Sequence, residues 1–208
     1  MGIVTRILIL SNVAVFVLQT LVGDSIIATF ALWPIGRFHV AEFHGEVGFH
    51  AWQLVTSAFL HANLTHLLLN MFALFTFGRD VERALGARRY LSLYAAAVLS
   101  AALVQLFVVS SAVTESAAPN PTVGASGGVF GVLLAFGLLF PRRTVMLLFP
   151  PIPMPAWVLV LSYALIELAN GVFGTTDGVA HFAHLGGMLG AYLVLRLHRP
   201  PGTHEPKL

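Results

Sequence analysis

Hydrophobic residues gather along the chain in six long runs, separated by shorter stretches rich in charged residues, proline or glycine. Each run approaches the ~20 residues that an α-helix needs to cross ~30 Å of hydrocarbon. The prolines between the runs end helices, and the charged residues resist burial in lipid. The pattern therefore predicts six transmembrane helices, near residues 5–23, 54–77, 90–111, 124–140, 155–173 and 180–197.

Composition places these helices in a bilayer. The chain has 208 residues, of which 57% are hydrophobic and 10% are charged, whereas a typical soluble domain has roughly 25% charged residues. We expect an all-α membrane protein in which residues 1–197 form one six-helix domain and residues 198–208 form a disordered cytoplasmic tail. Lysine and arginine form no patch of the kind that binds nucleic acid. Cysteine is absent, so disulfides and thiolate metal sites are excluded.

Positive charge predicts the orientation of the bundle. In a six-span arrangement, ten of the 11 lysines and arginines fall on one side of the membrane and only Arg37 falls on the other. Cytoplasmic loops carry the excess of positive charge, so both termini are expected in the cytoplasm. A compact multi-pass core of this kind is expected in a bacterial cytoplasmic membrane, with an organelle membrane as the alternative. The cytoplasmic set is Arg6, Arg79, Arg83, Arg88, Arg89, Arg142, Arg143, Arg196, Arg199 and Lys207.

Ionisable and strongly polar residues inside predicted spans are costly and tend to mark function, and four of them matter most here. His66 and Asn70 are four residues apart on the second helix, so they share one face. Ser126 begins the fourth helix and His184 lies on the sixth. Hydrogen bonding between helices remains the alternative explanation for His66 and Asn70.

Glycines surround Ser126. Gly124, Gly127 and Gly128 leave room for other backbones, which favours an unhindered nucleophile. Two prolines just upstream indicate that the helix starts near Ser126, where unpaired N–H groups could stabilise an oxyanion. Close packing of small residues is the alternative explanation for these glycines.

His184 lies among glycines as well. Gly186 and Gly190 form a close-packing pair, and a glycine face of the sixth helix against that of the fourth would bring His184 within hydrogen-bond reach of Ser126. His181 lies three residues earlier, so the two histidines could share a metal ion. A metal ion would need further ligands, and the sequence contains neither an HExxH motif nor an aspartate cluster to supply them. We therefore predict no metal and no cofactor.

Taken together, these motifs resemble the rhomboid family of intramembrane serine proteases. The resemblance extends over about residues 5–197, and the stretch from Gly78 to Gly86 is similar to the family's turn after the second helix. The motifs, in order on spans two, four and six, are His61-x4-His66-x3-Asn70, Gly124-x-Ser126-Gly127 and Ala183-His184-x-Gly186-Gly187.

The resemblance implies a role for each residue. Ser126 would be the nucleophile and His184 its general base, acting as a dyad because no aspartate is placed to orient the histidine. The Ser126 backbone N–H, His66 and Asn70 would form the oxyanion hole. Gly124 and Gly127 would support the site. Phe130 would be the aromatic residue that packs on His184, at a position where many members have tyrosine.

The predicted function is endoproteolysis of transmembrane segments inside a water-filled cavity, with membrane proteins as substrates and the bilayer as surroundings. A catalytically inactive rhomboid-like protein that binds membrane clients is one alternative. A small transporter is another, although no internal repeat is visible. His61, His181 and Glu167 receive no role: Glu167 either bonds a neighbouring helix or faces the cavity. The oligomeric state is not predicted.

Overall fold

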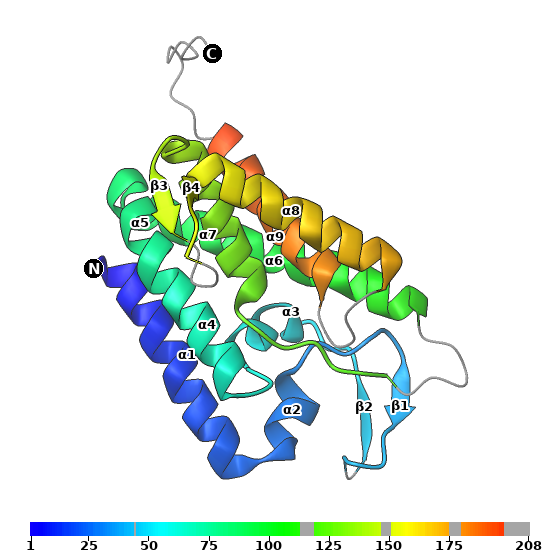
Figure 1. Cartoon of the computed structure of the whole chain (residues 1–208). Helices are drawn as coiled ribbons and strands as arrows, with labels where there is room; N and C mark the ends of the chain where they lie inside the picture. The colour runs from blue at the N-terminus through cyan, green and yellow to red at the C-terminus, as the bar shows by residue number, and fades with distance from the viewer. Residues whose placement is uncertain (44, 113–118, 147–150, 175–179, 198–208) are drawn as a thin grey trace.

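The computed structural model describes residues 1–43, 45–112, 119–146, 151–174 and 180–197, and in these ranges the chain is a bundle of apolar helices (Figure 1). This arrangement confirms the predicted all-α class. By length and composition, α1, α6 and α8 can each cross a bilayer, whereas α7 is a shorter apolar helix. The long helices are α1 (Ile3–Val22), α4 (Leu64–Ala73), α6 (Ala87–Ala112), α7 (Ser126–Leu139), α8 (Ala156–Phe173) and α9 (His181–Leu197).

The predicted start of the second helix, residue 54, is wrong. Residues before the helix form α3 (Gln53–Thr56) and a 3₁₀ turn, Ser57–Phe59, and this pair is bent by 96° from the helix that follows. The Asn63 side chain ends the irregular stretch, because it accepts a hydrogen bond from His66 N at 2.8 Å and so caps α4. Apolar residues continue through the bend, so hydropathy alone cannot reveal the cap.

The predicted end of the second helix, near residue 77, is also too early. Helical structure continues through a π-helical stretch, Leu74–Gly78, and through α5 (Arg79–Leu85). Gly86 then ends it with a φ of 77°, a conformation that suits glycine. The charged residues of this region leave the apolar run but remain good helix formers. The stretch from Gly78 to Gly86 is therefore mainly helix.

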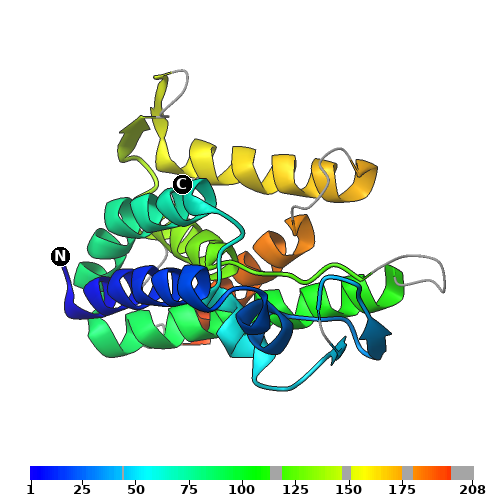
Figure 2. The same ribbon diagram turned by 90° about the horizontal axis from the view of Figure 1, so that it is seen from below.

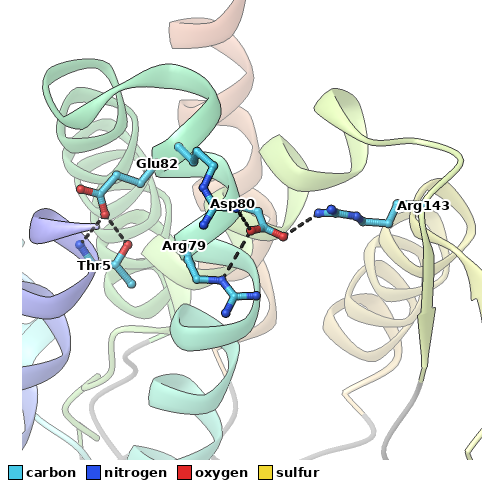
Figure 3. Close-up of polar contacts among 6 residues, drawn as sticks. Thr5, Arg79, Asp80, Glu82 and Arg143 are labelled. Atoms are coloured by element: carbon cyan, nitrogen blue, oxygen red, sulfur yellow. Dashed lines mark hydrogen bonds and ion pairs between the residues drawn. The ribbon is translucent and has the colours of Figure 1, made fainter. Parts of the chain in front are cut away.

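Charged and polar residues join α1, α5 and the turn after α7 at one end of the molecule (Figure 3). The Glu82 carboxylate accepts hydrogen bonds from the backbone N–H groups of Val4 and Thr5, both at 2.9 Å, and from the Thr5 hydroxyl at 2.6 Å. Asp80 makes ion pairs with three arginines at this end: Arg79, Arg83 and Arg143.

The opposite end is built from α2 (Asp24–Phe30) and an antiparallel hairpin of β1 (Arg37–His39) and β2 (Glu46–Gly48). Gln53 is fully buried there: its side chain accepts from the backbone N–H groups of Trp33 and His50 and donates to the carbonyls of Thr29 and Gly48. A second hairpin, β3 (Thr144–Met146) with β4 (Pro153–Pro155), leads into α8.

Helices α6, α7 and α9 pack directly on one another, and α8 lies at one edge of the bundle against α7 and α9 (Figure 2). The close packing depends on small residues. A Cβ atom added to Gly127 would overlap Ala101 of α6, and one added to Gly190 would overlap the Ala96 carbonyl. Van der Waals contact through small residues is how helices associate where no water drives them together.

Candidate active site

Ser126 is the first residue of α7, and an extended segment leads to it from Thr122. The Thr122 backbone pairs with Leu32, and Gly124 N donates to the Ser57 carbonyl at 2.9 Å. Gly124 has a φ of 137°, which an L-residue rarely adopts. Because the helix starts at Ser126, the backbone N–H groups of its first turn have no acceptor in a preceding turn. They are therefore available to an oxyanion beside the Ser126 hydroxyl.

His184 of α9 contacts this hydroxyl: Ser126 Oγ lies 2.8 Å from His184 Nε2. The two helices come this close because Gly187 of α9 lies against the Gly127 carbonyl of α7, where any Cβ would overlap it. The predicted contact of Gly186 and Gly190 with the fourth predicted span, now α7, is wrong, because both glycines face α6. Residues one position apart point about 100° apart on a helix, so a run of glycines does not reveal which one meets which partner.

Phe130 lies one turn after Ser126 and forms one wall around His184. The two rings are stacked, with centroids 4.2 Å apart and planes inclined by 3°. Tyr163 of α8 meets the Phe130 ring edge-on, with the two centroids 6.0 Å apart. Stacking on a ring limits rotation of the imidazole, which keeps Nε2 directed at the serine.

His66 and Asn70 of α4 approach the same region from the other side. A Cβ on Gly124 would lie 2.7 Å from His66 Cε1, so glycine at this position lets the imidazole pass close to the chain before Ser126. The Asn70 amide donates one hydrogen to the His66 carbonyl at 3.0 Å, which leaves its second hydrogen available. Within the described ranges, neither side chain forms a hydrogen bond with Ser126.

A cavity of about 610 Å³ connects these groups. Its wall includes His66, Asn70, Gly124, Ser126 and His184, together with the polar side chain of Gln105. Most of its other lining residues are apolar, and α4, α6, α7 and α9 all contribute to it. All seven residues proposed from sequence for the site therefore lie in one neighbourhood: six around the cavity and Phe130 on the His184 ring.

A carboxylate beside His184 was not predicted from the sequence. Glu167 of α8 is 7% exposed, and its Oε2 lies 2.6 Å from His181 Nδ1 and 2.9 Å from His184 Nδ1. The first contact is a hydrogen bond. The second is close in distance, although the His184 N–H is not aligned well enough to count as one. Glu167 thus bonds a neighbouring helix, and it is not among the described residues lining the cavity.

A signal for this contact was present but ambiguous. An ionisable residue within a span and a second histidine three positions before His184 both call for an explanation. Their meeting depends on how α8 packs against α9, however, and the apolar pattern of the two helices does not define that rotation. The sequence predicted a dyad with no aspartate to orient His184, whereas in the structure the longer side chain of a glutamate reaches across the helix interface to this histidine.

Glu167, His181 and His184 offer one ligand atom each, all within 4.8 Å of one another, and so form a possible metal-ligand set. The spacing favours a different interpretation. Ligand atoms at about 2.0–2.1 Å around tetrahedral zinc lie roughly 3.3 Å apart. The separations of 2.6 and 2.9 Å between nitrogen and oxygen are instead those of charge-assisted hydrogen bonds and close ion pairs.

His61 is completely buried behind His66, and the two rings meet edge-on with centroids 5.1 Å apart. Neither of its ring nitrogens has a hydrogen-bond partner among the described residues. Its backbone is held by Gln19 of α1, which donates to the His61 carbonyl at 2.7 Å and accepts from its N–H at 3.1 Å. His61 therefore backs the His66 ring and ties the site to α1.

Comparison with known proteins gives a consistent result. A family model described as Rhomboid domain matches residues 48–200. Rhomboid protein 1, mitochondrial, from Saccharomyces cerevisiae is 36% identical over 138 residues, which are 65% of this chain and 38% of that protein. Rhomboid protease GluP from Bacillus subtilis is 31% identical over 144 residues, or 68% of this chain and 25% of that protein.

A third relative, Rhomboid-like protein 16, chloroplastic, from Arabidopsis thaliana, is 27% identical over 200 residues, which are 89% of this chain and 59% of that protein. The matched part of the chain thus covers less than two thirds of the length of each of these relatives. Two of the three names refer to organelles, so they lend no support to the predicted bacterial cytoplasmic membrane. The apolar helices identify a membrane protein without indicating which membrane contains it.

Proposed function

The chain belongs to the rhomboid family, and from this premise we propose that it is an intramembrane serine endopeptidase in which Ser126 is the nucleophile and His184 the general base. The observation that carries the proposal is the 2.8 Å contact between Ser126 Oγ and His184 Nε2 at the wall of a cavity. This is the distance at which a base accepts the proton of an attacking hydroxyl.

The reaction proceeds in two stages. Ser126 Oγ attacks the carbonyl carbon of the scissile peptide, and its proton passes to His184 Nε2. The C–N bond then breaks, and His184 gives the same proton to the leaving amine, which leaves an ester on Ser126. A water molecule next attacks the ester, its proton passes to Nε2, and the C–O bond breaks as Ser126 regains a proton.

Negative charge on the carbonyl oxygen develops beside the start of α7. The Ser126 backbone N–H, at the positive end of the helix dipole, would stabilise it together with donors from His66 and Asn70. The free amide hydrogen of Asn70 and the His66 ring both border the cavity, so small side-chain rotations bring them to the oxyanion. Loss of one such donor typically lowers kcat by about 10²–10³-fold.

The proposed substrates are transmembrane segments of other proteins. A helix in lipid keeps its peptide groups hydrogen-bonded internally, so a segment must unwind before Ser126 can reach a carbonyl. Small or helix-breaking residues near the cut should therefore favour cleavage. The polar groups around the cavity provide a place where an unwound backbone and water can both be accommodated.

The test uses purified protein in detergent or in liposomes with a model transmembrane substrate. Wild type should yield a defined pair of fragments and should react with a fluorophosphonate probe. Ser126→Ala and His184→Ala should each lose cleavage, and Ser126→Ala should lose labelling. Wild type that binds the substrate without cutting it, and does not label, would instead favour the non-catalytic client-binding alternative.

A further inference from the structure

We propose that Glu167, held in place by His181, is a positioning residue for His184, so that Ser126, His184 and Glu167 form a triad supported by a second histidine. This inference rests on the proposed protease function and adds two residues to it. The carboxylate comes from α8 and both histidines come from α9. It lies on the side of His184 away from the serine, because Glu167 meets Nδ1 while Ser126 meets Nε2.

The protonation state that His184 needs as a base favours an acceptor beside Nδ1. A neutral imidazole carries one proton, and His184 can accept the Ser126 proton at Nε2 only when its own proton is on Nδ1. That Nδ1 is buried, and within the described residues it has no hydrogen-bond partner. Glu167 Oε2 lies next to it, at 2.9 Å, and can act as the acceptor. A carboxylate there favours the required tautomer over the one that would point an N–H at the serine.

The carboxylate also acts after proton transfer. When Nε2 takes the serine proton, His184 becomes an imidazolium cation that borders the cavity and stacks on the Phe130 ring, with its Nδ1 buried. An anion 2.9 Å away stabilises this cation strongly where water is scarce. This attraction depends mainly on distance, and catalytic hydrogen bonds that are poorly aligned in the free enzyme commonly tighten once substrate is bound.

His181 explains how the buried Glu167 side chain can stay both ionised and fixed in position. Its Nδ1 donates to the same Oε2 at 2.6 Å, so one carboxylate oxygen receives an N–H from one histidine and faces the N–H of the next. Both histidines lie on α9 three residues apart, on the face turned toward α8. A buried carboxylate without such donors would be costly and would tend to become protonated, and a protonated acid would not stabilise the imidazolium.

The arrangement makes α8 part of the catalytic machinery. Ser126 and His184 lie on α7 and α9, which pack closely, whereas α8 lies at the edge of the bundle (Figure 2). Glu167 is the described side chain through which α8 reaches His184 Nδ1. A displacement of α8 that withdrew this carboxylate would leave the Ser126–His184 contact in place but remove its support.

The experiment compares Glu167→Gln, which keeps the shape and removes the charge, with Glu167→Asp, which keeps the charge on a shorter side chain. End-point labelling with the fluorophosphonate gives the fraction of competent sites, and kcat is expressed per competent site. For Glu167→Gln we expect kcat and the labelling rate constant to fall by about 10²-fold, the lower end of the contribution of a positioned acid–base group. KM should change less than about twofold, because Glu167 does not line the cavity.

Glu167→Asp should recover part of this loss, and His181→Ala should lower kcat in the same direction by a smaller factor. Glu82→Gln is the matched control, because Glu82 is also a buried carboxylate within a helix but lies where α5 meets α1. It should lower the thermal midpoint while kcat per competent site stays at the wild-type value.

The results separate the two proposals. Wild type that neither cleaves nor labels would overturn the protease proposal itself. Wild type that depends on Ser126 while Glu167→Gln retains kcat within about twofold would overturn the positioning role alone. The positioning role is also overturned if Glu167→Gln lowers only the thermal midpoint and the fraction of competent sites while kcat per competent site is unchanged, which is the result expected for Glu82→Gln.

Discussion

At the scale of single residues, the site depends on positions where a side chain is absent. Gly124 lets the His66 ring approach the segment before Ser126, and Gly187 lets α9 approach α7 closely enough for His184 to reach the serine. The proposed catalytic groups therefore depend on glycines that allow the backbones to come close. Phe130 then restricts the imidazole through a nearly parallel stack.

Gly187→Ala tests this dependence. The added Cβ would overlap the Gly127 carbonyl, which belongs to a helix backbone and cannot move aside cheaply. Overpacking of this kind typically costs about 1–3 kcal/mol, so we expect a lower thermal midpoint and, in the protein that remains folded, a reduced labelling rate at Ser126. Leu189→Ala on the same helix is the control, because Leu189 is 52% exposed on the outside of the bundle. Equal stability of the two variants would contradict a packing role for Gly187.

Single residues also show which features of the site could be predicted from the sequence and which could not. Ser126, His184, His66 and Asn70 are recognisable because strongly polar groups are rare inside apolar runs. Glu167 is equally rare there, but its partner could not be identified, because that depends on the rotation of α8 against α9. Gly186 and Gly187 are adjacent in sequence yet face different helices.

At the scale of elements, the ends of helices are defined by specific side chains more than by loss of hydrophobicity. Asn63 starts α4 at a sharp bend in the chain, and Gly86 ends α5 well beyond the end of the second apolar run. The first turn of α1 is held by Glu82, whose carboxylate accepts from two backbone N–H groups and a hydroxyl (Figure 3). An anion at this position also complements the helix dipole.

Replacing Glu82 with alanine should therefore destabilise the junction of α1 and α5. Hydrogen bonds to a charged group contribute about 1.5–3 kcal/mol each when buried, and Glu82 is 5% exposed. We expect a loss of at least about 2 kcal/mol, seen as a lower midpoint in thermal unfolding, with unchanged kcat per competent site. Glu46→Ala removes an exposed ion pair with Arg37 and should be nearly neutral. A Glu82→Ala protein as stable as Glu46→Ala would refute the capping role.

At the scale of the whole molecule, the distribution of charge defines two ends. Arg79, Arg83 and Arg143 meet at Asp80, beside the start of α1, whereas Arg37 lies on the hairpin at the other end. Figure 1 shows that α1 begins and α9 finishes toward the end that carries α5. The positive-inside rule then predicts that this end lies in the cytoplasm.

The absence of cysteine makes this orientation directly measurable. We expect Arg37→Cys to react with a membrane-impermeant maleimide added outside intact cells or right-side-out vesicles. Arg88→Cys, which is also exposed in the structure, should react only after the membrane is opened. The cysteine-free parent controls for background labelling. The reverse pattern would overturn the assigned orientation.

Local properties of the chain were readable from the sequence alone. Apolar runs close to the length needed to cross a bilayer, the arginines and lysines between these runs, and polar residues within spans are each features of one stretch of sequence. They predicted the all-α membrane class, the six main helices and the residues around the cavity. Only the tertiary structure decided which faces meet: Gly187 against Gly127, the bend before α4, and Glu167 beside His184. Such contacts join segments far apart in sequence and follow from the rotation and depth of each helix, which are determined by packing against neighbours and not by hydrophobic pattern.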